Sequence, residues 1–157
     1  MIFENLLFGG NASQIRFTAS TAAGIALAIT GGALRAWCYR SLGKYFMFEM
    51  SIMKDHSLVT TGPYSVVRHP SYTGVIMTAI SNLLLHATNG SWVRESGLLR
   101  YLPSKIAAAF FVIMMCVGTL AVLMRMNAED RILRKEFGDK WDAWAARVRY
   151  MVIPGVL

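Results

Sequence analysis

Charged residues are scarce in this sequence. Asp, Glu, Lys and Arg account for 16% of its 157 residues, whereas a soluble domain carries about 25%. Hydrophobic residues account for 55%, and the mean hydropathy is +0.42. A surrounding bilayer explains this shortage of charge better than an unusually large core does. The length favours a single domain, so we expect one membrane-embedded domain over residues 1–157.

Acidic residues and cysteines are also few. The nine Asp and Glu are outnumbered by 16 Lys and Arg, which gives a formal charge of +7. The basic residues flank apolar runs and form no continuous patch, so membrane lipids are the expected partner and nucleic acid is not. Cys38 and Cys116 lie inside or beside apolar runs without metal-ligand spacing, so we expect free thiols and no metal site. No basic segment precedes an apolar stretch at the N-terminus, so a cleaved signal peptide is not expected.

Three uncharged runs are each close to the roughly 20 residues that a helix needs to cross a bilayer. The second run contains Asn89-Gly90-Ser91, so its helix should end near His86 or Ala87. The expected spans are about 16–35, 70–88 and 105–125.

Small residues recur at four-residue spacing in the first run, at Gly24, Ala28 and Gly32. Such spacing lets a second helix approach closely in lipid. A small-residue face turned toward lipid explains it equally well, and the pattern does not decide between the two.

The character of the chain changes after the third run. Residues 126–150 are rich in charge, with Leu133, Phe137, Trp141 and Trp144 at three- and four-residue spacing. This pattern predicts an amphipathic helical segment, interrupted at Gly138. Its tryptophans suit the headgroup region of a bilayer. The expected fold class is therefore all-α: a polytopic integral membrane protein with about three transmembrane helices and an amphipathic C-terminal segment.

The distribution of Lys and Arg predicts the orientation of these spans. Most of them lie in the segments that follow the first and third spans. Because positive segments stay on the cytosolic side, the N-terminus should be outside or lumenal. Residues 35–68 and the C-terminal segment should then share the cytosolic face.

Two polar segments fall on that predicted face. The first covers residues 56–74 and holds a turn, then Arg68-His69, then Pro70 at the predicted start of a helix. Proline is tolerated in a first helical turn, and free N–H groups there can hold a carboxylate. On composition alone, Arg68 and His69 are most simply interpreted as interface anchors.

The second polar segment is Arg125 to Asp130, at the end of the third run. Arg125 and Glu129 are four residues apart, so they share one face of a helix. An ordinary surface ion pair explains this spacing as well as a functional site does. Charged groups at a membrane boundary nevertheless favour a functional role.

Together these segments resemble the isoprenylcysteine carboxyl methyltransferase family and its phospholipid methyltransferase relatives. The resemblance covers roughly residues 49–154. The matching motifs are His-x-Leu-Val at 56–59, Gly-Pro-Tyr at 62–64, Arg-His-Pro-x-Tyr-x-Gly at 68–74, Arg-x-x-x-Glu-Asp at 125–130, Phe-Gly at 137–138, and Pro154. The chain departs from the family pattern where Asp130 replaces the second Glu of a pair and where Trp141 and Trp144 replace common tyrosines.

The resemblance implies an S-adenosylmethionine-dependent carboxyl O-methyltransferase of the endoplasmic reticulum membrane, with its active site facing the cytosol. It implies that Arg125 holds the substrate carboxylate. A prenylated protein or lipid-like molecule would be the substrate, and the oligomeric state is left open. The implied cofactor contacts are Glu49, His56, Ser57, Leu58, Val59, Tyr64, His69, Pro70, Ser71, Tyr72 and Glu129.

A carboxylate nucleophile would explain why the sequence offers no obvious catalytic base. A C-terminal carboxyl group has a pKa of roughly 3.3–3.7 and is ionised at neutral pH. The enzyme then has to align two reactants and exclude water. Three alternatives stay open: a phospholipid or other small-lipid methyltransferase, a membrane sterol reductase with a nicotinamide cofactor, and a non-enzymatic three-helix scaffold.

Overall fold

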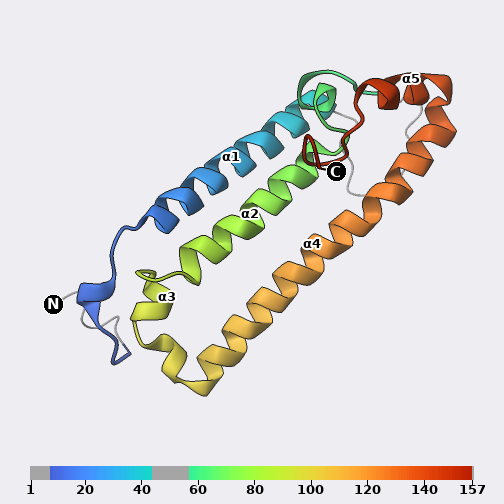
Figure 1. Cartoon of the computed structure of the whole chain (residues 1–157). Helices are drawn as coiled ribbons and strands as arrows, with labels where there is room; N and C mark the ends of the chain where they lie inside the picture. Colours follow the sequence, from blue (N-terminus) through green and yellow to red (C-terminus); the bar gives the residue numbers. More distant parts are fainter. Residues whose placement is uncertain (1–7, 44–56, 157) are drawn as a thin grey trace. The chain divides into compact units, whose positions relative to one another are not determined.

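A computed structural model describes residues 8–43 and 57–156, and this part of the chain contains helices and no strands (Figure 1). The all-α prediction is confirmed for these residues. Three helices are long: α1 (Ala19–Leu42), α2 (Pro70–His86) and α4 (Leu102–Phe137). Shorter elements complete the described fold: η2 (Ala12–Gln14), η4 (Gly62–Ser65), α3 (Trp92–Glu95), η5 (Leu98–Arg100) and α5 (Asp139–Arg147).

The chain divides into two compact units, and each long helix contributes residues to both. The first unit comprises Met1–Thr30 and Met77–Thr119. The second unit comprises Gly31–Ile76 and Leu120–Leu157. Both polar segments singled out in the sequence belong to the second unit.

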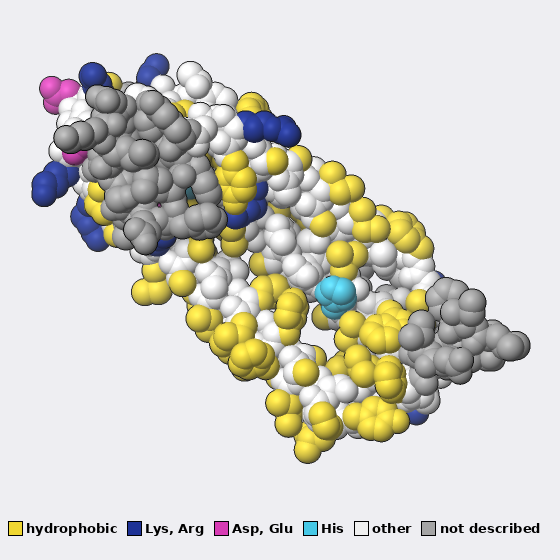
Figure 2. All heavy atoms as spheres, turned by 180° about the vertical axis from the view of Figure 1, so that it is seen from behind, with side chains coloured by type: hydrophobic (Ala, Val, Ile, Leu, Met, Phe, Trp, Pro, Cys, Tyr) yellow, Lys and Arg dark blue, Asp and Glu magenta, His cyan; other side chains and the backbone are white. Residues whose placement is uncertain are grey.

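Two helices are long and apolar enough to cross a membrane. They are α1, with 24 residues, and α4, with 36 residues. Only 17% of the most apolar window of α1 and 0% of that of α4 is buried within the protein, whereas the core helix of a soluble protein would be largely buried. Hydrophobic side chains are accordingly spread over the surface seen in Figure 2. The helix α2 has 17 residues, somewhat fewer than a span usually needs, so the predicted second span, at about 70–88, stays a prediction.

Local sequence explains where α1 and α2 begin and end. The Thr18 hydroxyl accepts from the Thr21 N–H at 3.2 Å, and the Thr21 hydroxyl accepts from the Thr18 N–H at 3.3 Å. This reciprocal pair satisfies donors at the start of α1. Pro70 occupies the first position of α2, as the sequence predicts. The predicted end of α2 is also confirmed, since the helix stops at His86, whose carbonyl accepts from the Ser91 hydroxyl at 2.8 Å.

The helix α4 continues well beyond Arg125 and ends at Phe137. The start of the charged segment is therefore part of the same helix as the third apolar run. The predicted interruption at Gly138 is confirmed: this residue has φ of +52° and separates α4 from α5. Glycine adopts such a conformation without the strain that a β-carbon would introduce.

Close helix approach occurs at only part of the small-residue pattern. In the first unit, a β-carbon on Gly24 would lie 2.9 Å from the Leu85 side chain, and the Ser81 hydroxyl donates to the Gly24 carbonyl at 2.8 Å. Among the described residues, no atom lies within 4 Å of a β-carbon built on Gly32. Close packing therefore occurs at Gly24, and the described residues show none at Gly32.

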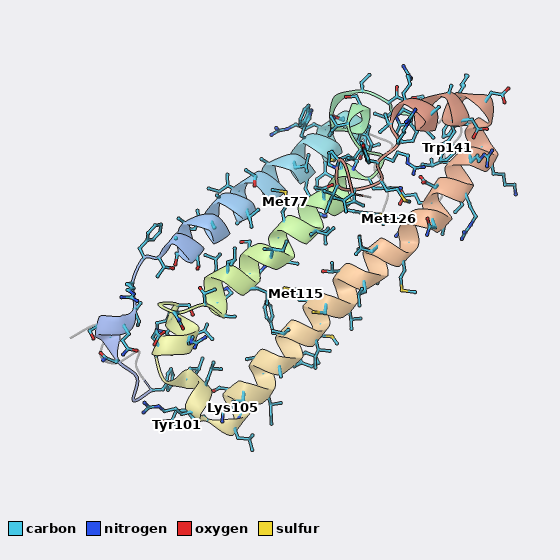
Figure 3. The ribbon with its side chains drawn as sticks, in the orientation of Figure 1. Met77, Tyr101, Lys105, Met115, Met126 and Trp141 are labelled. Atoms are coloured by element: carbon cyan, nitrogen blue, oxygen red, sulfur yellow. The ribbon has the colours of Figure 1, made fainter. Side chains whose placement is uncertain are left out.

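An aromatic cluster forms the core of the second unit. Its buried members are Cys38, Tyr64, Trp141, Trp144 and Val148. The Trp144 indole N–H donates to the Tyr64 carbonyl at 3.0 Å. Trp141, labelled in Figure 3, and Trp144 are only 8% and 3% exposed. The expectation that these tryptophans lie among lipid headgroups is therefore wrong: the apolar face of α5 packs inward.

Candidate active site

In the second unit, Asp130 of α4 bridges two basic residues that directly precede α2. Its Oδ2 atom lies 2.8 Å from Arg68 Nη1, and its Oδ1 atom lies 3.1 Å from His69 Nε2. The three side chains are only 11%, 15% and 5% exposed, respectively. A buried carboxylate is stable when it is paired in this way. The interpretation of Arg68 and His69 as interface anchors is therefore wrong, because both point into the protein.

A second contact joins α2 to α4 beside the first. The Tyr72 hydroxyl donates to Glu129 Oε2 at 2.6 Å. The rings of His69 and Tyr72 are stacked, with centroids 5.3 Å apart and planes 8° apart. The two polar segments of the sequence therefore meet through neighbouring pairs, His69 with Asp130 and Tyr72 with Glu129.

The C-terminal tail holds the start of α2 through main-chain carbonyls. The Arg68 N–H donates to the Tyr150 carbonyl at 2.9 Å, and the His69 N–H donates to the Met151 carbonyl at 2.7 Å. The Thr73 hydroxyl donates to the Val152 carbonyl at 2.7 Å. The His69 N–H is therefore already bonded within the protein and is not a free donor for a carboxylate. Sequence reasoning missed this role of the tail, because main-chain contacts need no particular side chain.

The Tyr64 side chain is buried in the aromatic cluster rather than in the polar pairs. Burial, reinforced by the neighbouring Cys38, raises the pKa of Tyr64 well above its usual value. Its hydroxyl therefore stays protonated. Leu58 and Val59 pack against the same cluster, whereas Ser57 is exposed. The predicted contacts Glu49 and His56 lie outside the described residues.

The remaining predicted site residues lie along α2 and α4. Pro70 is buried, and Ser71 is half-buried, with its carbonyl 3.4 Å from Arg35 Nη1. Arg125 is half-buried one turn before Glu129 and interacts electrostatically with Tyr72.

Arg35 was not recognised in the sequence as part of this region. It bonds the Tyr39 hydroxyl, and its guanidinium lies over the Tyr39 ring at 5.4 Å. A β-carbon on Gly74 would lie 2.6 Å from Arg35 Cγ and 2.9 Å from the Gly31 carbonyl oxygen. The glycine that ends the Arg-His-Pro motif therefore allows α1 to approach α2. Two features of the sequence could have indicated this contact: Gly74 is a small residue near the start of α2, and Arg35 is the charged residue that directly follows the first apolar run.

Comparisons with known proteins show which family the sequence is similar to. A sequence model of the isoprenylcysteine carboxyl methyltransferase family matches residues 24–95. Protein-S-isoprenylcysteine O-methyltransferase B of Arabidopsis thaliana is 26% identical over 127 residues, which cover 80% of this chain. The chain is therefore similar to the isoprenylcysteine carboxyl methyltransferase family over residues 24–95. It spans about half the length of this relative, 55% of which is covered.

The family model covers one of the two polar segments, and a side-chain contact connects that segment to the other. The matched residues of the methyltransferase family include Tyr64, His69 and Tyr72, whereas Arg125 and Glu129 lie beyond them. The contact of 2.6 Å between Tyr72 and Glu129 connects the matched part to α4. One candidate site is therefore assembled from segments that are distant in the sequence.

Proposed function

We propose that the protein transfers a methyl group from S-adenosylmethionine to the C-terminal carboxylate of a prenylated cysteine. The observation that carries the proposal is the meeting of the two family motifs at Tyr72–Glu129 and His69–Asp130. The family and the name of the Arabidopsis relative, an isoprenylcysteine O-methyltransferase, support the same reaction.

The donors and acceptors of the second unit fit this cofactor, which carries an ammonium group, a carboxylate and ribose hydroxyls. A carboxylate offers about four acceptor positions, so Glu129 can accept from Tyr72 and from a ligand hydroxyl or ammonium together. Ser57 is exposed and offers a hydroxyl and main-chain groups. The proposed set of cofactor contacts remains Glu49, His56, Ser57, Leu58, Val59, Tyr64, His69, Pro70, Ser71, Tyr72 and Glu129.

Within this set, one ring nitrogen of His69 is already paired with a carboxylate. Its Nε2 atom lies 3.1 Å from Asp130, and its ring face lies against Tyr72. Besides its place in this set, His69 would help to position the Tyr72 hydroxyl through the stacked rings.

When bound, the cofactor supplies an electrophilic methyl group. Arg125 would bind the substrate carboxylate, because a guanidinium can donate two parallel hydrogen bonds to its oxygens. The carboxylate is ionised at neutral pH, with a pKa of roughly 3.3–3.7, so no side chain has to remove a proton. The contribution of the protein is alignment and the exclusion of water.

We further propose that the protein is an integral protein of the endoplasmic reticulum membrane with this site on the cytosolic side. The exposed apolar surface of α4 supports membrane insertion, since large side chains along it would otherwise contact water. Examples are Ile106, Phe110, Phe111, Val117 and Leu120, each at least half exposed.

The test is a methyl-transfer assay with labelled S-adenosylmethionine on purified protein in detergent. Farnesylated cysteine and phosphatidylethanolamine are offered separately. We expect label on farnesylated cysteine that is released by mild base, as a methyl ester requires. Label on phosphatidylethanolamine alone would replace the proposed substrate, and binding of a nicotinamide cofactor without methyl transfer would overturn the reaction.

A further inference from the structure

A polar cavity of about 430 Å³ lies in the first unit, away from the residues assigned above. Two short segments line it: residues 13–16, just before α1, and residues 89–95, just after α2. Its lining residues are Ser13, Gln14, Arg16, Asn89, Gly90, Arg94 and Glu95.

Main-chain contacts hold the two walls of this cavity together. The Arg16 N–H donates to the Gly90 carbonyl at 3.2 Å, and the Asn11 N–H donates to the Glu95 carbonyl at 3.1 Å. Gly90 has φ of +87°, and a β-carbon there would lie 3.0 Å from the Arg16 carbonyl oxygen. A β-carbon on Gly10 would lie 2.1 Å from the Glu95 carbonyl oxygen. The cavity is therefore built into the fold of the unit.

The side chains of the cavity suit an anion. Two arginines, Arg16 and Arg94, line the cavity against one carboxylate residue, Glu95, and Arg94 Nη1 also donates to the Ala87 carbonyl at 3.4 Å. Glu95 Oε1 accepts from the Gly90 N–H at 3.0 Å, which offsets part of its charge. Arginine suits phosphate because its planar group donates parallel hydrogen bonds to two oxygens. The side-chain amides of Gln14 and Asn89 add neutral donors, whereas the Ser13 hydroxyl already donates to Asn11 Oδ1 at 2.7 Å.

Exposed aromatic side chains flank the two arginines. Phe17 follows Arg16 and is 73% exposed, and Trp92 lies two residues before Arg94 and is 40% exposed. In the same unit, Tyr101 and Lys105 lie together at the start of α4 (Figure 3). Aromatic residues beside basic residues at the ends of apolar helices are typical of the headgroup level of a bilayer. This surrounding favours a lipid over a soluble phosphate compound.

We propose that this cavity binds the phosphate of an anionic glycerophospholipid. Arg16 and Arg94 contact the phosphate oxygens, while the acyl chains lie along the apolar surface beside Phe17 and Trp92. The inference relies on membrane insertion and is independent of the methyl-transfer reaction.

Calorimetric titration of the detergent-purified protein tests the proposal. The probes are dihexanoyl phosphatidylglycerol, dihexanoyl phosphatidylcholine and inorganic phosphate. We expect phosphatidylglycerol to bind most tightly. Arg16→Gln/Arg94→Gln should weaken it about 30-fold, because each cation near a lipid headgroup contributes about a factor of five.

A matched control removes two exposed arginines from the second unit, as Arg131→Gln/Arg147→Gln. It loses the same charge and should retain the wild-type affinity. Arg16→Lys/Arg94→Lys keeps the charge without the planar groups and should fall between wild type and the glutamine variant. Equal affinities of wild type and Arg16→Gln/Arg94→Gln would overturn the proposal. Inorganic phosphate binding as tightly as phosphatidylglycerol would overturn the lipid assignment.

Discussion

Tyr72 and Glu129 are 57 residues apart in the sequence, and the Tyr72 hydroxyl donates to Glu129 Oε2 at 2.6 Å. The pair connects the first turn of α2 with α4. The next residue of α4, Asp130, contacts His69, whose ring stacks on Tyr72. Removing one member should therefore disturb the orientation of its neighbours as well as a single bond.

Tyr72→Phe should weaken binding of S-adenosylhomocysteine about fivefold, the effect of losing one hydrogen bond of roughly 1 kcal/mol. Glu129→Gln should weaken it more, because the charged acceptor is lost. Calorimetry in detergent measures both affinities. Tyr101→Phe, at an exposed tyrosine of the first unit, is the control. Unchanged affinity in folded Tyr72→Phe and Glu129→Gln would remove this pair from the cofactor site.

Asp130→Asn should destabilise the protein by about 3 kcal/mol, because it leaves the largely buried Arg68 side chain without a carboxylate partner. Asp142→Asn is a matched control at an exposed ion pair. There, Asp142 Oδ1 lies 2.9 Å from Arg134 Nε. There we expect a loss below about 1 kcal/mol. Unfolding by denaturant in a fixed detergent gives both values. Equal losses would mean that burial adds nothing to the Asp130 contacts.

Part of this arrangement could be predicted from the sequence, because its polar residues lie in two recognisable motifs, at 68–74 and 125–130. The sequence predicted the start of α2 at Pro70, the break at Gly138 and a shared location for the segments of His69 and Glu129. These features depend on local backbone geometry or on the family motifs. The roles of those residues in binding and catalysis remain predictions.

Other features could not be predicted because they depend on tertiary packing. The spacing of Trp141 and Trp144 correctly predicts an apolar face, but a helical pattern does not say whether lipid or protein covers it. The interpretation of His69 as an anchor failed for a related reason. Its partner Asp130 is 61 residues away, and composition holds no information on such a contact.

The raised pKa of Tyr64 predicts a loss of stability at alkaline pH. The ordinary tyrosine pKa is 10.0, and burial raises that of Tyr64 in the folded state. The folded protein therefore holds this proton more tightly than the unfolded chain does. Its stabilising contribution is complete below pH 10 and falls as the pH rises toward the folded-state pKa.

Tyr64→Phe should remove that part of the alkaline decline, although it also lowers stability at neutral pH by deleting a hydroxyl. Thermal unfolding of wild type and variant between about pH 8 and 11 measures the difference. Tyr101→Phe, at an exposed position, should decline like the wild type. A decline of the same steepness in Tyr64→Phe would contradict the assignment to this residue.

Variants of Arg125 distinguish a carboxylate substrate from an amine substrate. If it holds a carboxylate, Arg125→Lys keeps the charge but loses the planar two-point contact. The rate should then fall about tenfold or more, the effect of one charge-assisted hydrogen bond, and Arg125→Ala should lose more. Affinity for S-adenosylhomocysteine should change less than the rate in both variants.

The pH dependence of the rate gives an independent criterion. A carboxylate with a pKa of roughly 3.3–3.7 is ionised throughout the range from about pH 6 to 8, so the rate should be nearly flat when methyl transfer limits it. A protonated amine has no lone pair to attack with, so an amine substrate predicts a rate that rises with pH. The measurement is a pH–rate profile of wild type and Arg125→Lys with farnesylated cysteine and phosphatidylethanolamine. Robust methylation of farnesylated cysteine by Arg125→Ala would show that this arginine does not hold the nucleophile.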